Sequence, residues 1–147
     1  FRRRASLALT QNADDWSNRI APTLDDIERL ADDAYASLPE QFRQLCEGLV
    51  ILVEDFPDKE TLADMDCDTE FDLLGLFRGR GLAQGEHLAQ TGDEPNMIWL
   101  YRRPIIDYWA DSEDSLRAVV THVLVHEIGH HFGLSDEDME EIERRAG

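Results

Sequence analysis

Positive charge is scarce in this sequence of 147 residues, which has 14 lysine and arginine residues against 32 aspartate and glutamate residues. The formal net charge at pH 7 is −18. A protein that binds nucleic acid or anionic lipid needs a basic surface to meet the phosphate groups, so this composition argues against both as partners. An acidic excess of this size is typical of a well-solvated surface.

Long apolar runs and cysteine motifs are also missing. No apolar stretch approaches the roughly 20 residues of a membrane-spanning helix, so we expect no membrane partner. Cys46 and Cys67 form no CxxC motif and have no zinc-ribbon spacing. They are expected to be a reduced, buried pair, with a disulfide as the open alternative. The apolar stretch from Ala5 to Leu9 is too short for a signal peptide, so we expect a cytoplasmic protein.

The remaining composition is that of a globular protein, with 42% hydrophobic and 31% charged residues. A chain of this length forms one domain around a single core. Residues 1–19 carry little hydrophobic pattern and are predicted to be a loosely ordered tail. Residues 20–147 are predicted to be the folded domain.

Helical periodicity predicts a first helix over residues 23–38, with Thr23 and Asp26 as a capping box, and a short helical turn after Pro39. Three apolar segments are predicted to be strands, at residues 49–53, 73–78 and 97–106. The first is a continuous β-branched run and is predicted to be buried on both faces. Pro104 removes a hydrogen-bond donor from the third, which is therefore predicted to be an edge strand. Residues 82–95 are predicted to be a long loop.

A long helix is predicted over residues 113–132, capped by Asp111 or Ser112. Gly133 is predicted to end it in a left-handed conformation. A short final helix follows from Ser135 to Arg145, with Met139 in the core. The order of elements predicts an α+β domain with a small sheet.

The long helix contains the motif H-E-x-x-H, as His126, Glu127 and His130. Residues four apart lie on one helix face with Cβ atoms about 5–6 Å apart, so both histidines can bind one zinc ion. Glu127 is offset around the helix and can reach a metal-bound water as a general base. Gly133 allows a sharp chain reversal that returns Asp136 to the metal as third ligand. The alternative for Asp136 is a carboxylate that only stabilises the start of the last helix.

The pattern H-E-x-x-H-x-x-G-x-x-D resembles the zincin superfamily, with metzincin-type spacing and an aspartate as third ligand. Residues 73–79, 100–104 and 126–140 resemble a bacterial family of minimal zincin-like metallopeptidases, often labelled matrix-metalloprotease-like. This resemblance covers about residues 23–146. It implies a zinc site in a compact zincin-like domain, whose small mixed sheet has an edge strand packed on the active-site helix.

The other histidines have less specific interpretations. His122 lies one turn before His126, and we expect it to support the site from behind or to lie in the core, with a fourth metal ligand as the alternative. His131 is predicted to be a packing or surface residue, and His87 to be an exposed loop residue with a substrate-side role as the alternative.

Two charged clusters are also open to more than one interpretation. Residues 64–68 resemble a calcium loop but lack its glycine and closing glutamate, so a solvated acidic loop is favoured. Four arginines near two predicted strands either favour acidic substrates or make ordinary salt bridges: Arg78, Arg80, Arg102 and Arg103.

These residues favour zinc-dependent hydrolysis of a peptide or protein substrate. Zinc at His126, His130 and Asp136 would polarise the carbonyl and lower the pKa of its water toward ~7. Glu127 would pass the proton to the leaving amine, and the predicted edge strand at 97–106 would pair with the substrate. The alternatives are hydrolysis of another amide and a non-enzymatic zinc-binding structural or interaction module. Glu127 argues against the module, since a structural site needs no general base.

Overall fold

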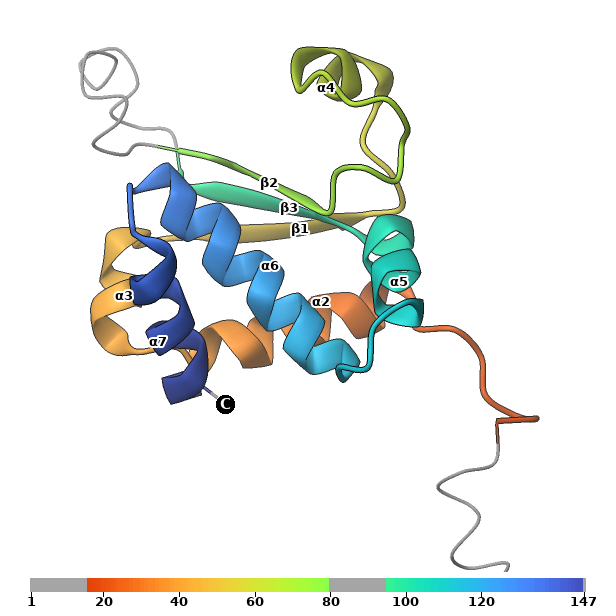
Figure 1. Ribbon diagram of the computed structural model, residues 1–147, viewed down its shortest axis with the longest axis horizontal. Coiled ribbons are helices and arrows are strands. Elements are labelled where there is room, and N and C mark those ends of the chain that lie inside the picture. The colour runs from red at the N-terminus through yellow and green to blue at the C-terminus, as the bar shows by residue number, and fades with distance from the viewer. Residues whose placement is uncertain (1–15, 80–94, 147) are drawn as a thin grey trace, which may run out of the picture.

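Three short strands form one mixed sheet in the order β1-β3-β2 (Figure 1). The computed structural model describes residues 16–79 and 95–146. Strand β1 spans Val50–Glu54, β2 spans Gly75–Arg78 and β3 spans Met97–Tyr101. β1 pairs with β3 in parallel, and β2 pairs with β3 antiparallel. The fold is therefore an α+β domain with a small mixed sheet, as the sequence predicts.

The central position of β3 shows that the predicted edge strand at residues 97–106 is wrong. The chain leaves the sheet after Tyr101 and forms helix α5 over Arg102–Ala110. Pro104 lies in the first turn of α5, where a backbone N–H has no partner within the helix, so a proline costs nothing there. In the described sheet the two edges are β1 and β2.

The prediction that residues 49–53 are buried on both faces is also wrong. The strand here is β1, Val50–Glu54, an edge strand with partly buried middle residues and exposed ends. An edge strand has one long side without a neighbouring strand, which leaves more of its surface open to solvent.

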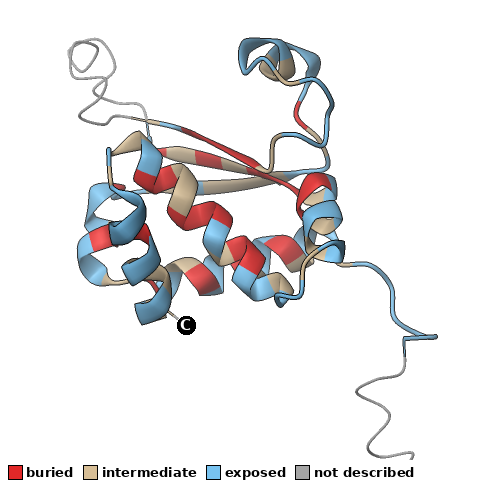
Figure 2. Cartoon of the chain, viewed as in Figure 1, coloured by how far each residue is buried: buried red, intermediate tan, exposed pale blue. Residues whose placement is uncertain are grey.

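Helices α2, Leu24–Ala36, and α6, Leu116–His131, cover one face of the sheet and pack on each other. Thr23 and Asp26 form the predicted capping box at the start of α2, with backbone-to-side-chain distances of 2.9 and 3.1 Å. Buried residues line the interior side of this helix layer (Figure 2). The core includes fully buried residues from both layers: Ile27, Ala31, Ile98, Leu100, Val120, Leu124 and Ile128.

The start of α6 differs from the predicted one. Asp111 and Ser112 end α5, and Ser115 caps α6 by accepting a hydrogen bond from the backbone N–H of Ala118 at 3.1 Å. Each of the three residues is a good N-cap, so local propensity alone does not choose among them. Among the helices described, none is both long and apolar enough to cross a membrane.

Three shorter helices complete the described chain: α3, Glu40–Leu45, α4, Lys59–Asp64, and α7, Asp136–Ala146. The sequence predicts α3 and α7 but not α4, which lies on the side of the sheet away from α2 and α6 (Figure 1). Residues 1–15, 80–94 and 147 lie outside the described residues, and with them Arg80, His87, most of the predicted tail and nearly all of the predicted loop.

Candidate metal centre

Helix α6, which is buried along one side, carries the H-E-x-x-H motif. Its core side packs against β2, β3 and α2, which fixes the helix relative to the sheet. His126 and His130 lie one turn apart, with their ring centroids 5.6 Å apart. His126 is partly buried and His130 is exposed. The motif therefore presents two imidazoles on one side of α6, as the spacing predicts.

Gly133 reverses the chain after α6 as predicted, with φ at +77°. The N–H groups of Gly133 and Leu134 donate to the carbonyls of His130 and Gly129 at 3.2 and 2.9 Å, a Schellman motif that satisfies two carbonyls at the helix end. A Cβ at Gly133 would meet nothing within 4 Å, so glycine is favoured by the backbone conformation and not by lack of space.

Helix α7 then runs back beside α6. Ser135 caps it, with its Oγ accepting from the N–H of Asp138 at 3.1 Å. Asp136 lines the same surface hollow as His126, together with the remaining lining residues His122, Glu140, Glu143 and Arg144. The chain reversal therefore brings the predicted third ligand to the same hollow as the first histidine.

Glu143 is the site residue that the sequence interpretation missed. Its carboxylate contacts two histidines: Oε2 lies 3.0 Å from Nε2 of His126, and Oε1 lies 3.2 Å from Nδ1 of His122. These three side chains form the one group of three possible metal ligands within 4.8 Å of one another in the described part of the chain. His130 and Asp136 are not in that group, so the predicted ligand set remains a prediction.

Sequence spacing contains a signal for Glu143. Asp136 and Glu143 are seven residues apart, which is nearly two full turns, so both lie on the same face of α7. His122, His126 and His130 form the matching row on α6. Because the two helices are joined by a short reversal, these rows lie opposite each other.

Burial is the main cause that lowers the pKa of His126, and the neighbouring His122 and His130 lower it further. The carboxylate of Glu143 opposes this shift. A lowered pKa keeps the imidazole neutral, which is the form that binds a metal ion.

Glu127 projects on a different side of α6, toward β2. A Cβ built on Gly75 would lie 3.4 Å from Cγ of Glu127, which shows how closely this side chain approaches the strand. Burial raises the pKa of Glu127 to about 7. Glu127 is therefore a carboxyl group poised to take up and release a proton near neutral pH.

The two other described histidines have clear surroundings. The ring of His131 packs against Phe77 at a centroid distance of 4.5 Å, so the packing role is confirmed. Its Nε2 atom is buried and has no hydrogen-bond partner among the described residues. His122 has a side chain 48% exposed and contacts Glu143, so its interpretation as a core residue is wrong.

The remaining charged groups make local contacts. Asp72 accepts hydrogen bonds from the N–H groups of Asp68 and Thr69 at 3.0 and 2.9 Å, within an exposed acidic loop. Arg102 forms an ion pair with Asp55 at 2.9 Å, which agrees with the salt-bridge interpretation for this arginine.

The donors around this hollow fit zinc, which binds imidazole nitrogen and carboxylate oxygen. Of the three predicted ligands, His126 and Asp136 line this hollow, and His130 lies one turn from His126 with their ring centroids 5.6 Å apart. A partly buried histidine with a lowered pKa, in a hollow lined by three carboxylates, is also consistent with a metal site.

Comparison with known proteins gives the family. The family model described as zincin-like metallopeptidase matches residues 46–146, which include the whole sheet, α6 and α7. A search of curated proteins finds no match. Because the matched range covers most of the sequence, including the H-E-x-x-H helix, the chain belongs to the zincin-like metallopeptidase family.

Proposed function

We propose that this protein is a zinc-dependent peptidase with His126, His130 and Asp136 as metal ligands and Glu127 as general base. The observation that carries the proposal is the position of Glu127. It follows His126 on the helix that packs against the sheet, lies against an edge strand, and has a pKa raised to about 7 by burial. The family assignment supports a peptidase.

Different residues of the chain have different roles in the proposed hydrolysis. When bound, zinc supplies a Lewis acid that lowers the pKa of a coordinated water and polarises the scissile carbonyl. Glu127 accepts the proton of the attacking water and donates it to the leaving amine, and a pKa near 7 suits both transfers. Gly133 returns Asp136 to the hollow that His126 lines.

Strand β2 replaces β3 as the strand proposed to bind the substrate. It is an edge of the described sheet, and its residue Gly75 lies beside Glu127. An extended peptide that adds to this edge forms main-chain hydrogen bonds with β2. Its backbone then lies next to Glu127, where the carbonyl must be attacked.

A non-enzymatic zinc module is the second candidate, and one observation favours it. His122, His126 and Glu143 already lie close enough together to share an ion. A site closed by these extra ligands would leave no open position for a substrate, as in structural zinc sites.

The variant Glu127→Gln distinguishes the two functions. It keeps the size of the side chain and removes the base, so zinc content should stay near one per chain while hydrolysis of a peptide library falls by at least ~100-fold. Zinc content is measured by mass spectrometry of the metal, and hydrolysis by mass spectrometry of the peptides.

His126→Ala is the control, and it should lose both zinc and activity. If the Glu127→Gln variant keeps its activity, the assignment of Glu127 as general base is wrong. Zinc-loaded wild type that cleaves no library peptide would favour the structural module.

A further inference from the structure

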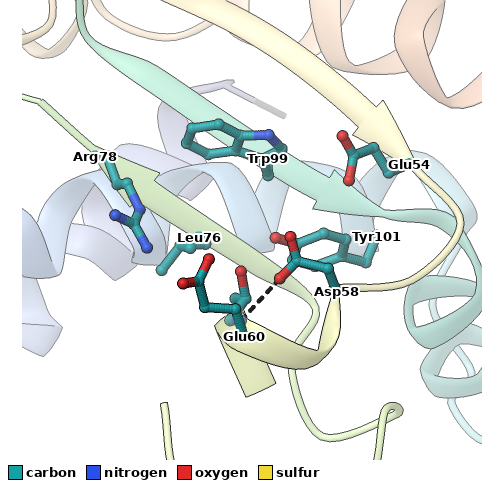
Figure 3. Close-up of a pocket in the computed structure, with 8 residues that line it drawn as sticks. Glu54, Asp58, Glu60, Leu76, Arg78, Trp99 and Tyr101 are labelled. Carbon is teal, nitrogen blue, oxygen red and sulfur yellow. Dashed lines mark hydrogen bonds between the residues drawn. The ribbon is translucent and has the colours of Figure 1, made fainter. Parts of the chain in front are cut away.

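A second hollow lies on the opposite face of the sheet from α6, under helix α4 (Figure 3). Its volume is about 280 Å³, just below the roughly 300–1,000 Å³ of pockets for drug-sized ligands, so it suits an occupant the size of a side chain. We name it the sheet pocket. Eight residues line it: Glu54, Asp58, Glu60, Thr61, Leu76, Arg78, Trp99 and Tyr101.

The alternation of strand residues explains why these side chains meet. Leu76 is paired with Trp99, and Glu54 with Tyr101, so all four lie on one face of the sheet. Gly75 lies on the other face, against α6 and Glu127. β2 is therefore shared by the two sites.

Tyr101 is the feature that indicates a ligand. The residue is 3% exposed, and its hydroxyl points into the sheet pocket (Figure 3). No hydrogen-bond partner for this hydroxyl lies among the described residues. Burial raises the pKa of Tyr101 to about 12, so the phenol stays protonated and can both donate and accept a hydrogen bond. The residue is otherwise enclosed by the fold, so its hydroxyl is open to a ligand only from the sheet pocket.

The charges around the sheet pocket select a cation. Three carboxylates, Glu54, Asp58 and Glu60, outnumber the single guanidinium of Arg78. Trp99 adds an aromatic side chain, which can attract a cation at its ring face. The three carboxylates do not form a metal-binding group among the described residues. These features suit an organic cation better than a metal ion.

We propose that the sheet pocket binds the lysine or arginine side chain of a peptide substrate. This inference rests on the proposed function, in which the peptide pairs with β2. In such a pairing, a substrate residue opposite Leu76 projects on the face of the sheet pocket, and its sequence neighbours project toward α6 and Glu127. We therefore expect the peptidase to prefer substrates with a lysine or arginine in the sheet pocket and the adjacent substrate residue facing α6.

A binding experiment tests the sheet pocket without any cleavage. The probes are N-acetyl-arginine amide and its neutral counterpart N-acetyl-citrulline amide, added to zinc-loaded full-length protein. The readout is the NMR signal of the Trp99 indole N–H, assigned with Trp99→Phe. We expect the arginine probe to shift this signal at millimolar concentration and the citrulline probe to leave it unchanged.

Two charge-matched triple variants give the control. Glu54→Gln/Asp58→Asn/Glu60→Gln removes the carboxylates of the sheet pocket, and asparagine keeps the N-cap that Asp58 provides for α4. The control removes three exposed carboxylates elsewhere: Glu28→Gln, Asp32→Asn and Glu40→Gln. We expect arginine binding to weaken at least ~10-fold in the first and less than ~2-fold in the second. Tyr101→Phe should weaken binding without changing any charge.

Cleavage of matched peptides then tests specificity. Peptides that differ only by arginine or citrulline at one position should differ in kcat/KM by at least ~10-fold, and only the pocket variant should lose this preference. If the arginine probe does not shift the Trp99 signal, the proposed binding role of the sheet pocket is wrong, even if the protein cleaves peptides. If the protein binds the arginine probe but cleaves no peptide, the result supports arginine binding by the sheet pocket and contradicts the proposed peptidase function.

Discussion

Asp136 and Glu143 lie on the same face of α7, and both line the hollow that contains His126. In the described structure Glu143 is the carboxylate that contacts His126, through Nε2 at 3.0 Å. In that contact Nε2 donates its hydrogen to the carboxylate, and a nitrogen that carries a hydrogen has no lone pair for zinc. If zinc binds Nε2 of His126, Glu143 must move aside. Asp136 and Glu140 are then the other carboxylates of the hollow, and Asp136 is the predicted ligand.

We therefore predict different effects for the two carboxylates. Asp136→Ala should weaken zinc affinity by at least ~10-fold, whereas Glu143→Ala should change it less. The measurement is competition with a zinc chelator of known affinity, with Glu141→Ala as a control on the exposed side of α7. A larger loss for Glu143→Ala than for Asp136→Ala would assign the third ligand to Glu143.

The two cysteines also differ at the residue scale, although both are free thiols. Burial raises the pKa of Cys46, whose residue is 0% exposed. Partial burial and the nearby carboxylates of Asp72, Asp66 and Asp68 raise the pKa of Cys67. The reactive species is the thiolate, so a raised pKa lowers reactivity at a given pH and makes it increase as the pH rises.

We predict that a thiol reagent labels one cysteine in the native protein, Cys67, and the second only after unfolding. Labelling of Cys67 should be slower at pH 7.5 than that of a free cysteine peptide, and added salt should reduce the difference by screening the carboxylates. Labelling is followed by intact mass. Cys67→Ser should abolish it in the native state, and rapid labelling of both cysteines would contradict the burial of Cys46.

At the scale of elements, the contact between β2 and α6 depends on Gly75. A Cβ there would lie 2.8 Å from Cγ1 of Val123 and 3.1 Å from the carbonyl oxygen of Trp99. The second neighbour is backbone in the central strand, so it cannot rotate away. The close approach of the strand to the helix that bears Glu127 therefore requires a residue without a side chain.

Gly75→Ala is predicted to lower the free energy of unfolding by about 1–3 kcal/mol, as overpacking in a core does. The measurement is chemical denaturation of zinc-free protein. Val123→Ala removes the closest clashing atom. The free energy of unfolding should therefore fall less in the Gly75→Ala/Val123→Ala double variant than the sum of the decreases in the two single variants. Strict additivity would show that the Val123 contact does not limit the approach of β2.

Short sequence patterns predicted the helix termini that are formed by capping residues close in sequence. The capping box at Thr23, the left-handed Gly133 and the Ser135 cap are each formed by residues within a few positions. The order of strands depends on pairing between distant segments, and no local pattern decided it. Pro104 was assigned to an edge strand because it lacks an N–H, but the same property suits the first turn of α5.

In the candidate site, too, local spacing predicted some residues, and others depend on contacts between distant segments. His126, Glu127 and His130 follow from spacing along one helix. Glu143 reaches His126 only through the packing of α7 on α6, a contact between residues 17 positions apart. The sheet pocket depends on the β2–β3 register and on α4, which the sequence interpretation did not include.

For the whole molecule, the dominant electrostatic feature is the net charge of −18. The 32 acidic residues exceed the 14 lysine and arginine residues, so even complete pairing would leave 18 carboxylates without a basic partner. Ion pairs such as Arg102 with Asp55 are exposed and contribute little. Repulsion among carboxylates should therefore outweigh attraction in the folded state.

Salt is therefore predicted to stabilise the protein. Raising NaCl from about 0.01 M to about 1 M shortens the Debye length from about 30 Å to about 3 Å, which screens repulsion between distant carboxylates. The Tm of zinc-free protein should rise by several degrees, measured by circular dichroism at constant pH. Glu28→Gln/Asp32→Asn/Glu40→Gln removes three negative charges and should show a smaller rise. A Tm that falls with salt would mean that ion pairs, and not repulsion, dominate the electrostatic free energy of folding.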